Sequence, residues 1–321
     1  MANVTENRSL KRLNTFGFDA KARYFAALNS LNEIRDILEE FNSYDLPLYI
    51  LGGGSNVIFS GDYEGLILHP QIKGLSIVDE NERYVWLKVG AGIVWDDFVN
   101  YATENNLCGV ENLSAIPGNV GAAPVQNIGA YGMEVKDSIY AVNGIFISDC
   151  SNFELRNEEC KFGYRDSVFK NELKQRAIVT SVIFRLSKIQ EYTLDYGDVK
   201  KKLKEYNEIN LRNIRDAIIK IRAEKLPNPK ELGNAGSFFK NPVVETKAAQ
   251  KMLKLYPSMP TYPFKGKVKL SAAWLIEKCN LKGYRLGNVG VHQNQALVLV
   301  HYGQGNVNEL LELSRMIQNT V

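Results

Sequence analysis

A hydroxyl group surrounded by small residues is the first feature of this sequence that could do chemistry. Ser237 lies in the run Gly-Asn-Ala-Gly-Ser-Phe-Phe-Lys-Asn-Pro at 233–242, where glycine and alanine would let the backbone approach a ligand closely. No Gly-x-Ser-x-Gly elbow surrounds this serine, and no histidine lies nearby in the sequence to take its proton. The pattern favours Ser237 as a proton donor over a nucleophile, although composition alone would favour a simple turn.

The next candidate catalytic residue is an arginine in a second motif. Arg165 lies in Gly-Tyr-Arg-Asp-Ser, ahead of an apolar run at 177–184. A guanidinium stays charged and can hold a carboxylate through two parallel hydrogen bonds, which suits the stabilisation of a developing enolate. The alternative is a surface arginine paired with Asp166, and Arg165 taken alone favours that alternative.

Two glycine-rich runs could hold a cofactor. The first, Gly-Gly-Gly-Ser-Asn at 52–56, follows a short apolar run at 48–51, so its backbone amides could converge on a phosphate. Its spacing matches neither the dinucleotide-binding fingerprint nor the P-loop, and a tight turn is the alternative. The second, at 116–132, is dense in glycine and alanine and nearly free of charge. It suggests backbone packed against a large flat group such as a flavin, with a buried interdomain connection as an equal alternative.

Composition limits the class of protein. The 321 residues are 45% apolar and 23% charged, which indicates a globular protein of two or three domains. The net charge of +3 is too small for a nucleic-acid-binding surface, but it would not repel an anionic small substrate. The four cysteines form no Cys-x-x-Cys pair and there are only three histidines, so neither a metal site nor a disulfide framework is expected. Without an apolar signal core or a run of membrane-spanning length, we expect a cytoplasmic protein.

Apolar spacing predicts helices that alternate with short strands, which is an α+β pattern. Helices are expected at 31–41 and after Val94, and strands at 48–51, 84–89, 177–184 and 296–300. In the C-terminal region, Thr246, Ser271 and Asn306 are each predicted to cap a helix. The last helix should turn four apolar residues inward: Val307, Leu310, Leu311 and Ile317.

In combination these motifs resemble the UDP-N-acetylenolpyruvoylglucosamine reductase family, flavoenzymes of bacterial cell-wall synthesis. The resemblance spans nearly the whole chain. Five segments carry it: Leu-Gly-Gly-Gly-Ser-Asn at 51–56, Ile-Pro-Gly-Asn-Val-Gly-Ala-Ala-Pro-Val-Gln-Asn-Ile-Gly-Ala-Tyr-Gly at 116–132, Tyr-Arg-Asp-Ser at 164–167, Lys-Leu-Pro-Asn-Pro-Lys at 225–230, and the serine run at 233–242. The segment Leu-Asp-Tyr-Gly-Asp at 194–198 is similar to the substrate-covering loop of the family's longer subtype, which would place Tyr196 over the nucleotide.

The resemblance implies a two-part flavin-binding domain of the vanillyl-alcohol oxidase type, followed by a C-terminal α/β substrate-binding domain. We expect flavin-binding subdomains at 1–70 and 71–217 and the substrate domain at 218–321. A boundary near 217 fits a helical stretch that leads into Pro227 and Pro229.

The resemblance also implies a reaction, the NADPH-dependent reduction of UDP-N-acetylglucosamine enolpyruvate to UDP-N-acetylmuramate through bound FAD. This step of peptidoglycan synthesis would serve cell-wall formation, cell shape and cell division. Hydride would pass from NADPH to the flavin and then to the enolpyruvyl methylene carbon. Arg165 would stabilise the enolate and Ser237 would deliver the proton. The implied partners are the nucleotide-sugar and NADPH, with no metal, membrane or nucleic-acid polymer, and a monomer is expected.

The matched motifs supply the other site residues. The implied cofactor-binding residues are Gly52, Gly53, Gly54, Ser55, Asn56, Pro117, Gly118, Gly121, Ala122, Gln126, Asn127, Gly129 and Ala130. The implied substrate-binding residues are Tyr131, Tyr164, Tyr196, Lys225, Asn241 and Gln295. Lys240 is a weaker candidate for a charge near the carboxylate or pyrophosphate, since a lysine outside a motif is usually a solvated surface residue.

One departure from the family pattern concerns a second acid. The family carries a glutamate after its last helix, and no glutamate of this sequence matches that motif, since Glu309 and Glu312 lie within the predicted helix. We therefore expect a truncated chain. The main alternative to the reductase function is a non-catalytic flavin or nucleotide-sugar binding protein. A flavin oxidase that uses oxygen is a third interpretation, which the serine and arginine motifs disfavour.

Overall fold

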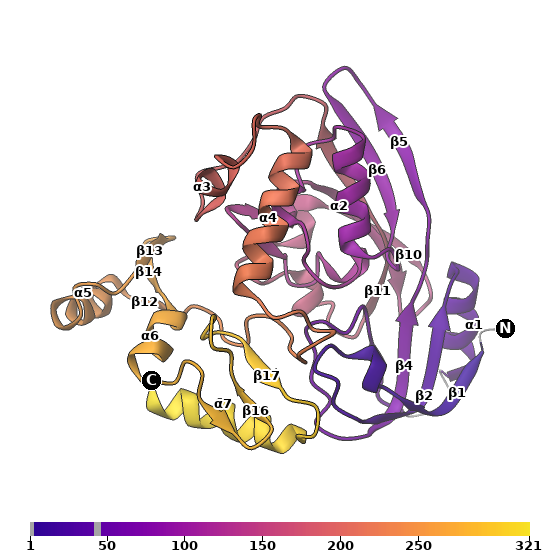
Figure 1. Cartoon of the computed structure of the whole chain (residues 1–321). Coiled ribbons are helices and arrows are strands. Elements are labelled where there is room, and N and C mark those ends of the chain that lie inside the picture. The colour runs from indigo at the N-terminus through magenta and orange to yellow at the C-terminus, as the bar shows by residue number, and fades with distance from the viewer. Residues whose placement is uncertain (1–2, 42–45) are drawn as a thin grey trace. The chain divides into compact units, whose positions relative to one another are not determined.

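The computed structural model describes residues 3–41 and 46–321 (Figure 1). Its chain contacts divide it into two compact units. The first contains Met1–Ser9, Lys21–Gly54 and Asp62–Glu224, and the second contains Leu10–Ala20, Ser55–Gly61 and Lys225–Val321. Two short N-terminal segments thus belong with the C-terminal region. The three-part division predicted from the sequence remains a prediction.

A four-stranded sheet begins the first unit, with strand order β1-β2-β4-β3. Its strands are β1 (Val4–Ser9), β2 (Lys21–Leu28), β3 (Leu48–Ile50) and β4 (Tyr63–Pro70). β2 and β3 pair parallel to β4, whereas β1 is antiparallel to β2. Helix α1 (Leu31–Phe41) buries Ile34 and Ile37 in the same apolar cluster as Leu66 and Leu68 of β4, as its periodicity predicted.

A five-stranded antiparallel sheet forms the rest of the first unit's framework, in the order β10-β9-β11-β6-β5. Its strands are β5 (Leu75–Glu80), β6 (Tyr84–Gly90), β9 (Ile139–Phe146), β10 (Asn152–Arg156) and β11 (Ala177–Ser187). Helix α2 (Trp95–Glu104) packs Trp95 and Phe98 against Phe184 of β11, with ring centroids 5.9 and 4.5 Å away. These large aromatic contacts anchor α2, whose first turn carries Asp96.

Short elements of the first unit lie between and after these strands. β7 (Gly129–Ala130) and β8 (Met133–Glu134) form a two-residue hairpin ladder, and α3 (Val199–Leu203) and α4 (Leu211–Lys225) follow β11. The two helices share a core that includes Ile214, Ile218 and Leu203, and Tyr131 packs against it. This contact brings the end of the glycine-rich run next to α4.

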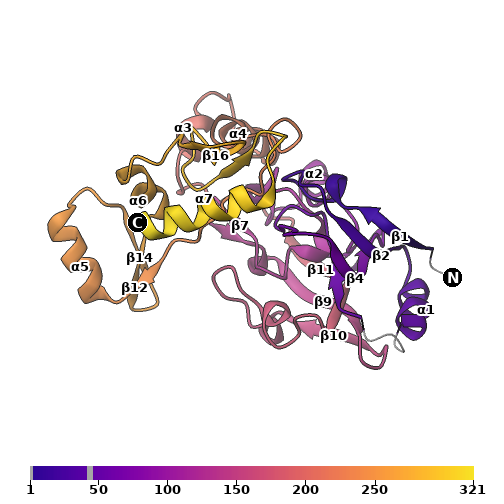
Figure 2. The same ribbon diagram turned by 90° about the horizontal axis from the view of Figure 1, so that it is seen from below.

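The second unit contains two small antiparallel sheets and three α-helices in its C-terminal part. One sheet has the order β12 (Val243–Val244), β14 (Lys267–Leu270), β13 (Thr261–Phe264), and the other is β15 (Arg285–Leu286), β16 (Val289–Val291), β17 (Leu299–His301). The helices are α5 (Thr246–Leu255), α6 (Ala272–Lys278) and α7 (Val307–Thr320). α7 packs on β16 (Figure 2), and both contribute to a core that also takes in Phe16 and Phe18.

Local capping rules succeed at two of the three predicted helix starts. The side chains of Ser271 and Asn306 accept hydrogen bonds from the amides of Trp274 and Glu309, at 3.3 and 3.1 Å. The prediction for Thr246 was wrong, because the cap position is Glu245 and the Thr246 hydroxyl donates instead to the carbonyl of Gly266 at 3.2 Å.

Two further predictions in the C-terminal region need correction. α7 buries the predicted Leu310 and Ile317, but it buries Leu313 in place of Leu311, which is only half-buried, so the inward face is turned slightly from the predicted one. The last strand is Leu299–His301, because the residues just before it form a turn in which the amide of Val298 donates to the carbonyl of Gln295 at 3.0 Å. The α+β class itself is confirmed, with mixed helix and sheet content in both units.

Candidate functional site

The two glycine-rich runs of the first unit lie directly against each other. A Cβ built on Gly53 would be 2.9 Å from Cα of Gly118, and one on Gly52 would be 3.1 Å from Cβ of Ala122. Similarly, a Cβ on Gly121 would be 2.5 Å from Cβ of Ala91. Part of the glycine content is therefore needed for backbone to pack on backbone, in addition to any contact with a ligand.

The same contact leaves backbone donors available at its edge. Among the described residues, the amides of Gly52, Gly53 and Gly118 donate to no backbone carbonyl. Gly53 is exposed, and Gly118 adopts φ +126°, which only glycine takes readily. Backbone amides that lack such partners can bind an anion where they converge on it. The arrangement therefore fits the phosphate or ring edge of a flavin, and Pro117 and Ala122 flank it.

Arg165 holds the second half of this run from the side. Its guanidinium donates to the carbonyl of Asn127 at 3.1 Å and to the carbonyl of Gly129. A Cβ on Gly129 would be 2.8 Å from the arginine Nη1, so a glycine is required there. A guanidinium has five N–H donors, so Arg165 can hold this turn and still donate to a carboxylate. Its Cζ lies 5.7 Å from the ring centroid of Tyr164.

Two buried side chains also link the glycine-rich run to the segment that carries Arg165. Asn127 Nδ2 donates to the carbonyl of Gly163 at 2.9 Å and to Glu134 Oε2 at 3.0 Å, and its Oδ1 accepts from the amide of Lys136. Ser167 Oγ donates to the carbonyl of Val125 at 2.6 Å. The Asn127 side chain is thus fully engaged within the protein, which leaves its predicted contact with the cofactor to its backbone. Gln126 and Ala130 are half-buried neighbours in the same run.

Tyr131, the last residue but one of the glycine-rich run, has a strained conformation. Its φ is +46°, in the left-handed region that bulky residues rarely adopt. Its phenol makes a hydrogen bond with Arg222, and its carbonyl accepts from Asn112 Nδ2 at 2.8 Å. Tyr196 is 54% exposed, which suits a residue that is predicted to cover a ligand.

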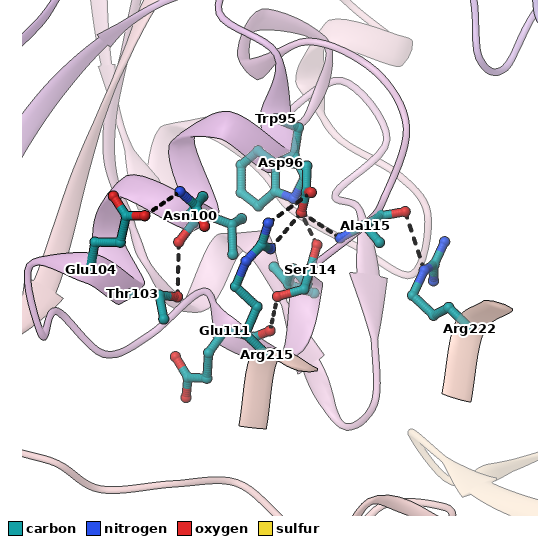
Figure 3. A network of polar contacts seen from close by, with 12 residues as sticks. Trp95, Asp96, Asn100, Thr103, Glu104, Glu111, Ser114, Ala115, Arg215 and Arg222 are labelled. Carbon is teal, nitrogen blue, oxygen red and sulfur yellow. Dashed lines mark hydrogen bonds and ion pairs between the residues drawn. The ribbon is translucent and has the colours of Figure 1, made fainter. Parts of the chain in front are cut away.

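A partly buried network joins α2 and α4 to the start of the glycine-rich run (Figure 3). Asp96 accepts from Arg215 Nη1 at 2.6 Å and Nη2 at 2.9 Å, and from the amide of Ala115 at 2.6 Å. Arg222 Nε donates to the carbonyl of Ala115 at 3.2 Å. Sequence reasoning did not find these residues, because they carry no motif and Arg215 lies 119 positions from Asp96.

The network fixes the charge states of its members. Burial alone would raise the pKa of Asp96, but the hydrogen bonds from Arg215 and Ala115 and the positive charges of Arg215 and Arg222 bring it below the ordinary value. Burial lowers the pKa of Arg222, against the opposing effects of Tyr131 and Asp96. A guanidinium remains charged over the whole physiological range, so Arg222 brings a positive charge to the phenol of Tyr131.

His69 supports the other glycine run through the residue that precedes it. Its Nδ1 lies 2.8 Å from the carbonyl of Leu51, and its Nε2 lies 2.7 Å from Gln71 Nε2. Burial lowers the pKa of His69, the hydrogen bond to Leu51 opposes this, and Lys73 adds to the lowering. A neutral ring that donates through Nδ1 and accepts through Nε2 satisfies both contacts.

In the second unit, Ser237 lies on an exposed loop that is shaped by its neighbours. The buried Asn234 donates to the carbonyls of Pro227 and Leu232 at 3.1 and 2.8 Å, and accepts from the amide of Gly236 at 3.0 Å. Ser237 then forms an isolated bridge with Val298. Among the described residues its hydroxyl has no hydrogen-bond partner, so it is available to a ligand.

The remaining predicted residues of the second unit lie in several different segments. Gln295 Oε1 lies 3.5 Å from the amide of Leu297, next to the Ser237 bridge. Asn241 Oδ1 accepts from the amide of Ala272 at 3.0 Å, at the start of α6. Three predicted residues lie elsewhere in this unit: the exposed Lys225 at the end of α4, and the half-buried Ser55 and exposed Asn56 of the Ser55–Gly61 segment. Lys240 is exposed.

The described residues contain no grouping of three or more histidine, cysteine, aspartate or glutamate side chains that could hold a metal ion. No described helix is long and apolar enough to cross a membrane.

Two family models match the chain. One is the FAD binding domain, over residues 22–144, which includes the two opposed glycine runs. The other is the C-terminal domain of UDP-N-acetylenolpyruvoylglucosamine reductase, over residues 228–321, which includes Ser237.

Relatives match over almost the whole length. The chain is 46% identical to UDP-N-acetylenolpyruvoylglucosamine reductase of Flavobacterium johnsoniae, covering 99% of this chain and 95% of that protein. It is 44% identical to the enzyme of that name from Neisseria gonorrhoeae, covering 100% and 94%. The crystal structure of UDP-N-acetylenolpyruvylglucosamine reductase from Thermus caldophilus superposes with a TM-score of 0.70 at 23% identity, covering 100% and 96%, which shows a shared fold. The chain belongs to the UDP-N-acetylenolpyruvoylglucosamine reductase family, as its motifs indicated.

Proposed function

We propose that this chain reduces UDP-N-acetylglucosamine enolpyruvate to UDP-N-acetylmuramate, with NADPH as the electron source and bound FAD as the carrier. The observation that carries the proposal is the 46% identity to a named reductase across 99% of the chain. The adjacent glycine runs and the available Ser237 hydroxyl are what such a reaction needs. The non-catalytic alternative is not favoured.

FAD, when bound, would accept a hydride from NADPH and supply one to the methylene carbon of the enolpyruvyl group. The amides of Gly52, Gly53 and Gly118 would hold its anionic or polar edge, since they have no backbone partner among the described residues. The small side chains around Ala122 would let the ring approach the backbone closely.

Arg165 would stabilise negative charge on the substrate. Hydride addition to the methylene carbon turns the neighbouring carbon and its carboxylate into an enolate, and a preorganised cation is most effective where charge develops. The two carbonyl contacts of Arg165 fix the plane of its guanidinium without neutralising its charge. A fixed fork of donors can then grip the carboxylate through two parallel bonds.

Ser237 would donate the proton that completes the reaction. The balance is one hydride from NADPH to the methylene carbon and one proton from the Ser237 hydroxyl to the adjacent carbon, with solvent restoring the serine. An ordinary alcohol is a weak acid, so this step requires the enolate to be a strong acceptor. Lys225, Asn241 and Gln295 would bind the nucleotide-sugar, together with Tyr131, Tyr164 and Tyr196.

The proposal extends to the setting of the reaction. The enzyme would act as a monomer in the cytoplasm, where the nucleotide-sugar and NADPH are available, and would supply peptidoglycan precursors. The second acid of the family is assigned to no residue here. Glu309 in particular serves the fold, because its Oε2 accepts from the amide of Asn288 at 3.1 Å.

Replacement of Ser237 tests the assignment. Ser237→Ala should lower the turnover number roughly 10²- to 10⁴-fold, while NADPH still bleaches the bound flavin at the wild-type rate. Ser258→Ala is the matched control, because Ser258 is another exposed serine of the second unit and lies outside the predicted site. Turnover by Ser237→Ala at the wild-type rate would remove the serine from the mechanism.

A further inference from the structure

Asn112 is a fully buried amide that connects two distant segments of the first unit. It lies in the 3-10 turn Glu111–Leu113 and has no exposed surface. Its Nδ2 donates to the carbonyl of Tyr131 at 2.8 Å and to the carbonyl of Thr193 at 2.7 Å, 81 positions away. A single side chain thus holds the end of the glycine-rich run and the segment that leads to Tyr196.

The turn that Asn112 holds has an unfavourable backbone conformation. Tyr131 and Gly132 have φ angles of +46° and +85°, and the left-handed region is unfavourable for a tyrosine. The bond from Asn112 fixes the Tyr131 carbonyl, and Arg222 fixes its phenol. Both ends of this residue are therefore held by groups of the same unit.

The second segment touches the first at this turn. Tyr192 and Leu194 pack into the same apolar cluster as Tyr131, which leaves Tyr196 to lie outside, 54% exposed. A Cβ built on Gly132 would lie 3.1 Å from Cβ of Tyr196 and 3.4 Å from Cγ2 of Thr193. The position of Tyr196 therefore depends on the backbone that Asn112 connects.

One atom of the Asn112 side chain is not satisfied by the fold. Its Oδ1 is buried and has no hydrogen-bond partner among the described residues, which is destabilising. Asn112 thus has one oxygen unsatisfied, while both of its donor hydrogens are used. Residues that break such a rule tend to lie at functional sites.

We propose that Asn112 is a positioning residue that couples the Tyr131 turn to the Tyr196 segment, so that one buried amide sets the geometry of both tyrosines for the nucleotide-sugar. The part that concerns substrate rests on the proposed function, because that function makes these tyrosines substrate contacts. The coupling between the two segments rests on the contacts alone.

The test uses the FAD-loaded full chain with Asn112→Ser and Asn112→Leu. Serine keeps one hydrogen-bond donor on a shorter side chain. Leucine has a size similar to that of asparagine but has no donor. Asn157→Ser is the matched control, because Asn157 Nδ2 likewise spans two carbonyls of the first unit, those of Lys136 and Ile139, both at 2.7 Å. Two quantities are measured: amide hydrogen exchange of peptides that cover 190–198, and KM for UDP-N-acetylglucosamine enolpyruvate and for NADPH.

Asn112→Ser and the control Asn157→Ser should have different effects. Asn112→Ser should speed exchange at 190–198 about tenfold and raise KM for the nucleotide-sugar about tenfold, as the loss of one buried hydrogen bond implies. KM for NADPH and the flavin absorbance should stay unchanged. Tyr196→Ala should add little to the KM of Asn112→Ser, because both changes act on one contact.

Other outcomes would distinguish the coupling of the two segments from the proposed reaction. Unchanged exchange at 190–198 in a folded Asn112→Ser protein, or equal acceleration by Asn157→Ser, would overturn the coupling. If the wild-type chain has no turnover but Asn112→Ser still speeds this exchange, the coupling is supported while the proposed reaction fails. If the Asn112 variants do not fold, Gly132→Ala separates the same segments with Asn112 intact, and an unchanged KM for the nucleotide-sugar would then overturn the proposal.

Discussion

The bidentate pair of Asp96 and Arg215 should stabilise the first unit measurably. Replacing Asp96 by asparagine keeps the shape of the side chain and one oxygen for the amide of Ala115. It removes the charge that faces Arg215 and places an NH₂ group where Arg215 needs an acceptor. The Arg215 side chain is only 11% exposed and that of Asp96 is 33% exposed, so water can replace the lost partner only in part.

These exposures set the expected size of the effect. An exposed ion pair contributes at most about 1 kcal/mol, and breaking a buried one costs about 3–5 kcal/mol. The intermediate exposure of this pair predicts that Asp96→Asn lowers the free energy of unfolding by about 2 kcal/mol. For a cooperative unit of about 150–250 residues, this corresponds to a fall in Tm of roughly 4–8 °C.

Urea unfolding of the flavin-free chain at pH 7, followed by tryptophan emission, would measure this change. A Trp274→Phe background leaves Trp86 and the buried Trp95, both in the first unit, as the reporters. Asp97→Asn is the matched control, since Asp97 lies in the same helical turn but is exposed. It should lower the free energy of unfolding by less than about 1 kcal/mol.

Two results would refute the reasoning. One is a cost for Asp96→Asn no larger than that for Asp97→Asn. The other is a double variant with Arg215→Gln whose cost equals the sum of the two single costs, since paired residues should be non-additive by about 0.5–3 kcal/mol. Because the folded pKa of Asp96 is lowered, the contribution of its charge should be present at neutral pH and lost as pH falls through that pKa.

Three further predictions concern the substrate carboxylate, flavin binding and the pH dependence of stability. Arg165→Lys should lower turnover by roughly 10²- to 10³-fold, with NADPH-driven bleaching of the flavin retained; normal turnover would show that no fork of donors is needed. Gly53→Ala should weaken FAD binding about tenfold or more, because its Cβ would lie 2.9 Å from Gly118 Cα; Gly61→Ala, with nothing within 4 Å of its Cβ, should not, and equal affinities in a titration would count against the packing argument. The pKa of His69 is lowered from 6.5, so the unfolded chain takes up a proton there first, and stability should decline as pH falls below about 6.5. His69→Gln should remove this part of the decline in urea titrations at pH 5 and 7, and an unchanged slope would contradict it.

Local sequence rules predicted several helices and the glycine-rich part of the candidate site. The bounds of α1 follow from the spacing of its apolar residues, and the caps at Ser271 and Asn306 follow from residue type and position. The glycine runs at 52–56 and 116–132 pointed to a cofactor site, and an FAD binding domain model covers both. These features are local, so a single sequence contains the information they need.

The same rules could not predict which side chains meet across a long stretch of sequence. Asp96 meets Arg215 across 119 positions, and Asn112 meets Thr193 across 81. None of these residues belongs to a motif, and the sheet topology brings them together. The glycines were also interpreted too narrowly, because part of their role at Gly53 and Gly121 is to let two loops touch. The roles of Arg165, Ser237 and the substrate-binding residues remain proposals, to be decided by kinetics.

Anaerobic stopped-flow absorbance in the flavin band tests the central claim most directly. NADPH is added first to the FAD-loaded chain, and UDP-N-acetylglucosamine enolpyruvate is added second. We predict bleaching by NADPH and then a return of colour driven by the nucleotide-sugar, with UDP-N-acetylmuramate formed in equal amount. A chain that bleaches and stays bleached, or one that never holds flavin, would contradict the assignment of this reaction.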